Sequence, residues 1–210
     1  MSNDYVTLAP DENQARGLGQ FAIDFLEGKF AGPDESVLRQ VERFHLDSVA
    51  CGVSALACAT NAPTLLRREA LEYVCQPAHG VPCFGSTVAV RPEKAVLANC
   101  SAVREWDANG TNFGYDPARG HIAGEFGHND FYPVAIAATQ QASLDGVTAL
   151  RGMLAIDEIR GRLAEVFSLK SYKIDHVVYG GIASAAVYGC GSWVTRAWYS
   201  LKTGSASCRS

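Results

Sequence analysis

The feature that most constrains the fold is a helical spacing of apolar residues that returns along the chain, broken mainly at glycine and proline. Apolar residues at 18, 21, 22, 25 and 26 follow the i, i+3, i+4, i+7 pattern of an amphipathic helix, and Gly32-Pro33 ends that helix. The same kind of argument predicts helices over residues 34–59, 63–75, 92–106, 131–142, 147–167 and 176–189. This succession predicts an all-α core.

The expected helix boundaries rest on residues with known preferences at helix ends. Asp34 is a good N-cap, Pro92 suits the first position of a helix, and Asp175 or a neighbour caps the last helix. Residues 76–92 carry three prolines and two glycines, which predict a loop with a short extended piece, STVAV.

The last segment breaks this pattern. Residues 190–210, CGSWVTRAWYSLKTGSASCRS, show no helical or strand period and are rich in serine, glycine and cysteine. We therefore expect residues 1–189 to form one helical domain. The tail, residues 190–210, is either disordered or a replacement for a lost natural continuation.

Composition excludes several classes of protein. The 210 residues are 48% hydrophobic and 19% charged, with a formal net charge of −4 and no basic run, which argues against a general nucleic-acid binder. No apolar stretch reaches the roughly 20 residues that a membrane span needs, and the N-terminus does not resemble a signal peptide. The seven cysteines include no Cys-x-x-Cys pair, so reduced cytosol is the simplest compartment.

The segment 105–116, EWDANGTNFGYD, carries many oxygen side chains and raises the question of a metal site. Asp107 and Asn109 fit the first and third positions of a calcium loop, but Gly110 falls at the fourth position rather than the sixth. A zinc site from His121, Glu125 and His128 lacks the His-Glu-x-x-His spacing. Neither metal site is favoured.

Acid–base chemistry is the other hypothesis from the residues alone. A loop that holds an aspartate, a hydroxyl and His128, together with His176 from another helix start, could surround a small acid. Histidine titrates near neutral pH, so it can take up a proton from carbon or return one to a leaving hydroxide. Helix starts near Asn129 and Asp175 would favour an anionic group.

Five stretches carry a resemblance to a known family. They are FHLDSVACGVSALA, VLANCSAVREWDANGT, GHNDFYPVAIAATQ, IDEIRGRLAEVF and DHVVYGGIASAAVYG, in this order along the chain. Together they resemble the MmgE/PrpD family, which includes 2-methylcitrate dehydratase and cis-aconitate decarboxylase. The resemblance covers about residues 15 to 189.

The resemblance implies a large all-helical domain, a smaller α/β lid and a homodimer formed through the helical part. It implies a lyase of propionate catabolism: a hydro-lyase like 2-methylcitrate dehydratase, acting on a small tricarboxylate without metal or other cofactor. No nucleic-acid or membrane partner is implied. We expect a cytoplasmic protein, or a mitochondrial one in a eukaryote.

Four residues match the motifs of the family. By the resemblance, His128 and His176 are the candidates for proton transfer, Asp107 orients or relays, and Thr111 binds substrate. The loop between Thr111 and His128 is longer than is usual, so His121 is an alternative to His128, although the sequence GHND favours His128.

The chain also departs from the family. By the resemblance, the catalytic lysine and the α/β lid lie beyond residue 189, where the tail no longer resembles the family. We therefore expect a truncated or frame-shifted chain with little or no turnover. The alternatives are an inactive helical fragment able only to dimerise, an enzyme like cis-aconitate decarboxylase, and a metal-binding loop.

Overall fold

Helices make up nearly all of the regular structure in the computed structural model, which describes residues 13–111, 118, 127–166 and 169–191. The α-helices of this described part are α1 (Gln14–Leu26), α2 (Glu35–Ala57), α3 (Asn61–Ala70), α4 (Pro92–Arg104), α5 (Tyr132–Gln141), α6 (Gly146–Val166) and α7 (Val177–Gly191). Two 3₁₀ turns, η2 (His128–Phe131) and η3 (Leu169–Tyr172), and the short strands β1 (Val81–Pro82) and β2 (Ala89–Val90) complete the list. The predicted all-α core is confirmed.

Local chemistry explains where several helices begin. The Asn13 side chain accepts a hydrogen bond from the Arg16 backbone N–H at 3.2 Å and so caps α1. Pro92 stands in the first turn of α4, where its missing N–H costs nothing. Asp34 occupies the N-cap position of α2, as predicted, but its side chain makes no capping hydrogen bond.

The third predicted helix is too long at its C-terminal end. It was expected to reach Cys75, but α3 ends at Ala70. The following residues pair with the hairpin instead: Cys75 donates its N–H to the Ala89 carbonyl at 3.0 Å, and the Tyr73 carbonyl accepts from Arg91 at 2.9 Å. This pairing extends the antiparallel contact of β1 with β2, and tertiary hydrogen bonds here override helix propensity.

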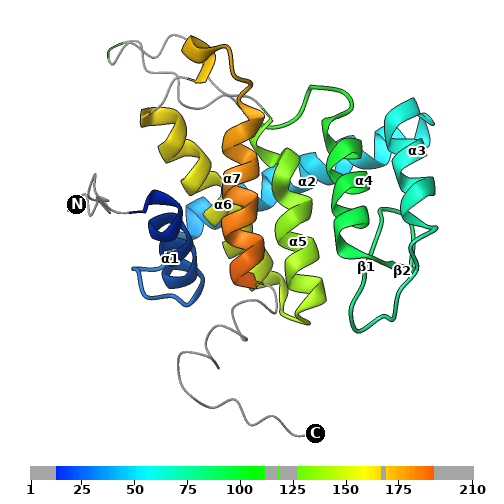
Figure 1. The fold of residues 1–210 in the computed structure, drawn as a ribbon, viewed down its shortest axis with the longest axis horizontal. Coiled ribbons are helices and arrows are strands. Elements are labelled where there is room, and N and C mark those ends of the chain that lie inside the picture. The colour runs from blue at the N-terminus through cyan, green and yellow to red at the C-terminus, as the bar shows by residue number, and fades with distance from the viewer. Residues whose placement is uncertain (1–12, 112–117, 119–126, 167–168, 192–210) are drawn as a thin grey trace, which may run out of the picture.

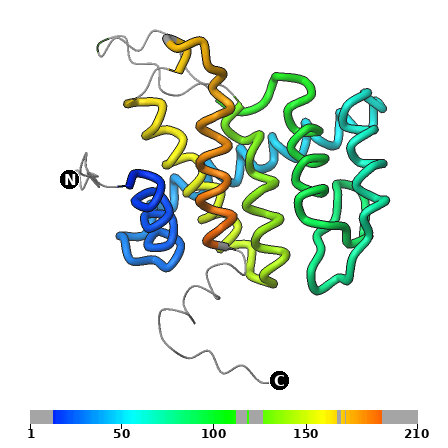
Figure 2. Tube along the Cα trace, viewed as in Figure 1, coloured from blue at the N-terminus to red at the C-terminus, as the bar shows by residue number. Residues whose placement is uncertain are grey.

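The helices form one packed array. In Figure 1, α7, α5 and α4 stand side by side, α3 follows at one end, and α2 crosses behind them. Helix α2 packs against both α4 and α6, so it joins the two ends of the array. Figure 2 shows that the first helix of the described part, α1, lies beside the last, α7, and the two are in contact.

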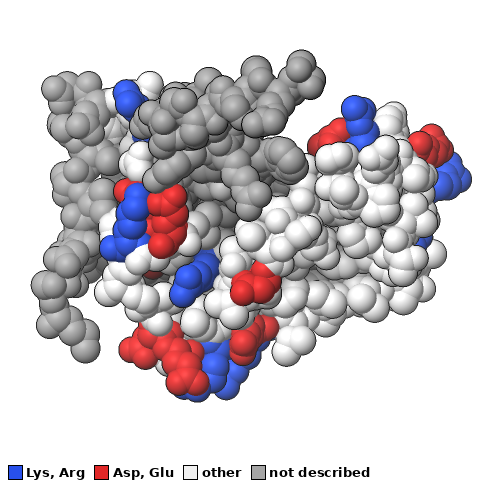
Figure 3. Space-filling model, turned by 90° about the horizontal axis from the view of Figure 1, so that it is seen from below, with Lys and Arg blue, Asp and Glu red and all other residues white. Residues whose placement is uncertain are grey.

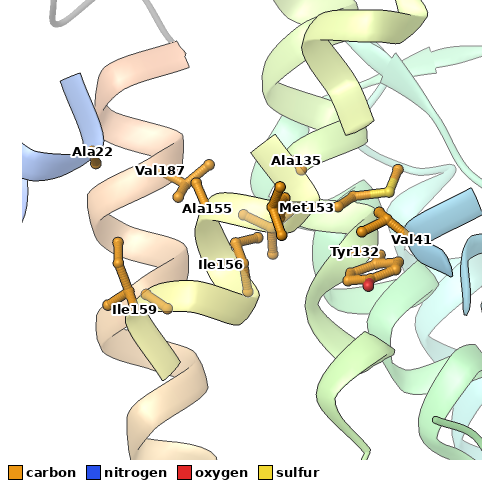
Figure 4. Close-up of a cluster of buried hydrophobic side chains, with 12 residues drawn as sticks. Ala22, Val41, Tyr132, Ala135, Met153, Ala155, Ile156, Ile159 and Val187 are labelled. Carbon is orange, nitrogen blue, oxygen red and sulfur yellow. The ribbon is translucent and has the colours of Figure 1, made fainter. Parts of the chain in front are cut away.

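The main core is centred on α6. Its residues Met153, Ile156 and Ile159 are almost fully buried. Figure 4 shows them in one cluster with buried side chains from four other helices, Ala22 of α1, Val41 of α2, Tyr132 and Ala135 of α5, and Val187 of α7. A second, smaller cluster of buried residues joins the hairpin to α3, α4 and α5. Burial on this scale fixes α6, and with it the polar residues that α6 carries.

The surface view in Figure 3 shows charged side chains in small groups, in which acidic and basic residues are neighbours, with wide uncharged areas between them. Among the described residues, no single helix is long and apolar enough to cross a membrane. Only α2 and α3 taken together meet the length and composition test, and they are bent by 92° relative to each other.

Two adjacent glycines of α7 provide a test of the packing. A Cβ at Gly180 would overlap the Phe131 ring, whereas a Cβ at Gly181 would meet nothing within 4 Å. We expect Gly180→Ala to lower the free energy of unfolding by about 2 kcal/mol, because overpacking must displace the ring. We expect Gly181→Ala to raise it by about 0.5–1 kcal/mol, because alanine favours the helix. Urea unfolding of both variants checks this, and equal effects would contradict the packing described here.

Candidate functional site

A pocket of about 300 Å³ lies where α2, η2 and α6 come together. Its lining residues are Phe44, Thr111, His128, Asp157, Glu158, Gly161, Arg162 and Glu165. Two of the four predicted site residues, Thr111 and His128, are therefore brought together in one cavity, although they are 17 positions apart in the sequence.

His128 is the most completely buried residue of this lining, with 3% of its surface exposed. The Phe44 ring lies edge-on to the imidazole, with 4.4 Å between ring centroids, and the Tyr132 ring lies at 5.9 Å. The Thr111 backbone N–H donates to His128 Nδ1 at 3.2 Å. Because Nδ1 accepts this hydrogen bond, the neutral imidazole carries its proton on Nε2.

The surroundings of His128 also set its charge. Burial, assisted by the positive charge of Arg160, lowers the pKa of His128 from 6.5 to about 4, against the opposing effects of Thr111 and Asp47. His128 is therefore neutral at pH 7 and can donate a hydrogen bond from Nε2 without carrying a positive charge.

The lowered pKa of His128 predicts how the stability of the protein depends on pH. Between pH 6.5 and about 4, His128 binds a proton in the unfolded state but not in the folded state. Its contribution to stability is therefore complete above pH 6.5 and is lost as the pH falls, by about 1.4 kcal/mol per pH unit. We expect the wild type to lose more stability than His128→Asn over this range, measured by urea unfolding at several pH values. Parallel pH profiles would contradict a buried neutral His128.

A network of buried polar side chains holds the segment after α4 against η2. Asp47 Oδ2 accepts hydrogen bonds from the Gly110 backbone N–H at 2.7 Å and from Asn129 Nδ2 at 2.9 Å. Asn109 Nδ2 donates to Asn129 Oδ1 and to Asp130 Oδ1, both at 2.6 Å. Helix α2, the segment 109–111 and η2 are thus tied together directly behind His128.

Gly110 is required by this arrangement. It has φ +78°, a conformation that side chains rarely adopt, and a Cβ there would lie 2.8 Å from both Asn129 Oδ1 and His128 Nδ1. The Asn-Gly step between Asp107 and Thr111 therefore makes a tight turn that brings the Thr111 N–H to the histidine.

Asp107 lies outside the pocket lining. Its exposed carboxylate forms an ion pair with Arg104 Nη1, and Arg104 Nε lies 3.5 Å from Asp130 Oδ2. Burial raises the pKa of Asp130, while Asn109 and Arg104 act in the opposite direction. The structure places Asp107 one ion pair away from Asp130 of the buried network, and the negative charge of Asp107 also contributes to raising the pKa of Asp130.

His176 lies directly before α7 and is not among the residues that line the pocket. Its Nδ1 is 3.6 Å from Asp175 Oδ1. Its predicted role in proton transfer stays a prediction.

The described residues give little support to either hypothesis of a metal site. His121 and Glu125 lie outside them. Within residues 13–111, 118, 127–166 and 169–191, no group of three or more His, Cys, Asp or Glu side chains is placed to hold a metal ion. Asp107 and Asn109 are engaged by Arg104 and by the Asn129–Asp130 pair, respectively.

The structure adds a pocket residue that the motifs did not suggest. Asp157 lines the pocket from α6 and accepts a hydrogen bond from the Tyr132 hydroxyl at 2.6 Å. Burial, together with neighbouring Glu158, raises the pKa of Asp157 to about 7, although Tyr132 and Arg160 oppose the shift. Carboxyl groups with such values are frequent in active sites.

Comparison with known proteins agrees with the motifs. A model of the MmgE/PrpD N-terminal domain matches residues 20–191, which is most of the chain. No solved structure matches the chain. The matched span runs from α1 to the end of α7 and includes every residue of the pocket lining. The chain belongs to the MmgE/PrpD family and contains its N-terminal domain.

Proposed function

We propose that this pocket takes part in the dehydration of a citrate-type tricarboxylate, as in 2-methylcitrate dehydratase. The observation that supports the proposal best is the grouping of three residues in one cavity: a buried neutral histidine, a threonine and a carboxyl with a raised pKa, namely His128, Thr111 and Asp157. An elimination of water needs polar groups of these kinds around a substrate that carries both a hydroxyl and carboxylates.

The reaction requires three events. A base removes the proton from the carbon next to a carboxylate, the C–H electron pair becomes the new double bond, and the C–O bond breaks so that oxygen leaves with its electron pair. By family membership, His176 is the proposed base and Thr111 the proposed ligand for a substrate carboxylate.

The contacts of His128 support a more specific proposal for its role. A histidine that is neutral at pH 7, with its proton on Nε2, is suited to donate a hydrogen bond to oxygen that becomes more negative. We therefore assign it to the stabilisation of developing charge on a substrate oxygen. Asp107 would position the turn at residues 109–111 through Arg104 and Asp130.

Among the described residues of the pocket lining, the only arginine, Arg162, is already paired with two glutamates, which limits how the pocket can bind substrate carboxylates. Arg162 Nε lies 3.3 Å from Glu158 Oε2, and its Nη1 lies 3.1 Å from Glu165 Oε2. Substrate carboxylates would have to compete with these two glutamates for Arg162. A tricarboxylate therefore needs cations from outside the eight lining residues as well.

The test is a search for product at high protein concentration. The protein is incubated with 2-methylcitrate, with citrate and with cis-aconitate. Formation of a double bond is followed by ultraviolet absorbance, and release of carbon dioxide is measured separately. We expect slow dehydration of a hydroxytricarboxylate. Carbon dioxide from cis-aconitate without dehydration would favour a decarboxylase, and a folded protein that neither forms product nor binds these acids would overturn the proposal. The homodimer and the cytoplasmic location stay predictions.

A further inference from the structure

The two carboxyl oxygens of Asp157 differ in their hydrogen bonding. Its Oδ2 accepts the hydrogen bond from Tyr132, whereas Oδ1 is buried and accepts no hydrogen bond from any described residue. A carboxylate has room for about four hydrogen bonds, so an ionised Asp157 would be poorly satisfied here. A protonated carboxyl fits the same place better, because it carries no charge.

Tyr132 connects this carboxyl to the histidine across the pocket. Its ring lies 5.9 Å from the His128 ring, at an angle of 86°, and its hydroxyl reaches Asp157. Asp157 and His128 thus lie on α6 and η2, and Tyr132 of α5 contacts both of them. All three elements are held by the main core, so the spacing of the two groups is fixed by packing.

The other charged groups around Asp157 come from the same elements. Glu158 follows it on α6 and disfavours its ionisation, whereas Arg160, also on α6 and fully buried, favours it. Glu165 and Arg162 line the pocket one to two turns further along α6 and are paired with each other. From η2, the group that faces the cavity is His128, which is neutral at pH 7.

We propose that Asp157 is a further catalytic residue, a protonated carboxyl that gives its proton to the leaving hydroxyl of the substrate. This inference rests on the function proposed above. Asp157 lines the pocket and its carboxyl carries the proton, while its Oδ2 accepts the hydrogen bond from Tyr132. The C–O bond breaks with its electron pair on oxygen, oxygen takes the proton, and water leaves. Asp157 becomes a carboxylate, which Tyr132 stabilises until a proton from solvent restores it.

Substrate binding strengthens this assignment to acid rather than base. The carboxylates of a tricarboxylate add negative charge beside Asp157, and like charges disfavour ionisation. Asp157 therefore becomes more protonated in the complex, which suits an acid and hinders a base. His128 does not compete for this role, because its acidic imidazolium form is absent at pH 7 and loss of the Nε2 proton from the neutral ring would leave an unstable imidazolate.

The kinetic test compares two matched substitutions. Asp157→Asn keeps the shape of the side chain but has no proton to transfer, and Asp34→Asn makes the same chemical change at an exposed helix cap. We expect Asp157→Asn to lower kcat about 100-fold or more while changing the Kd of tricarballylate, an unreactive tricarboxylate, by less than about threefold. We expect Asp34→Asn to change neither. A change in KM alone, or normal kcat, would overturn the proposed role.

A spectroscopic test separates this inference from the function on which it rests. The carboxyl signal of Asp157 is identified in ¹³C-aspartate-labelled protein by its loss in Asp157→Asn and is followed against pH with and without tricarballylate. We expect a midpoint near neutral pH that rises when the ligand binds. Binding without such a rise, or a midpoint below about 5, would overturn the role of Asp157 alone. If tricarballylate does not bind, the proposed function fails and this inference fails with it.

Discussion

Replacing His128 with asparagine is expected to lower kcat/KM for the proposed dehydration about 1000-fold. The side chain is buried at the pocket, its Nδ1 is occupied by the Thr111 N–H, and its ring is neutral at pH 7. In the proposed function, the Nε2–H is the group assigned to the substrate. Asparagine places an amide near the position of Nδ1 and leaves nothing at the position of Nε2.

Glutamine is the matched substitution at the same position, because its amide reaches the position of Nε2. We expect His128→Gln to retain roughly 10-fold more activity than His128→Asn, since it keeps a donor towards the substrate. The same absorbance assay, run at high protein concentration, measures both. If asparagine is the better replacement, His128 acts mainly by holding Thr111, and the donor role assigned to it is wrong.

The helical part of the fold could be predicted because its signals are local. Helix α6 was predicted over residues 147–167 and is observed over Gly146–Val166, because its apolar spacing extends over the whole helix. Helix α3 was predicted five residues too long at its C-terminal end, because Tyr73 and Cys75 pair with the hairpin. Pairing between segments is not visible in helical periodicity.

The candidate site could be predicted only in part. Motifs pointed to Thr111 and His128, and the structure brings both into one pocket. Asp47 and Asn129 are 82 positions apart, and no spacing rule connects a polar residue of one helix with a partner so distant. A signal for Asp157 did exist: it shares one face of α6 with buried Met153, four residues before it, and buried Arg160, three residues after it. Charged residues on an apolar face indicate a buried polar site.

The second large effect is expected at Asn129, which is fully buried. Its Nδ2 donates to the Phe44 carbonyl and to Asp47 Oδ2, both at 2.9 Å, and its Oδ1 accepts from Asn109 at 2.6 Å. We expect Asn129→Ala to lower the free energy of unfolding by about 4 kcal/mol, because buried groups on three other residues lose a partner. Urea unfolding at pH 7 measures this change, with Asn61→Ala, at an exposed position of α3, as the control.

A double-mutant cycle shows whether Asn129 acts through Asp47. The Asp47 carboxylate also accepts the Gly110 N–H at 2.7 Å, so Asp47→Ala alone should be destabilising. Once Asp47 is replaced, the removal of Asn129 leaves no carboxylate without a partner, and we expect its cost to fall by about 1–2 kcal/mol. Strictly additive effects would mean that the two residues stabilise the fold independently. Coupling would show that α2 and η2 are held together by one buried network, which fixes His128 and the turn at Gly110 in the geometry that the proposed chemistry requires.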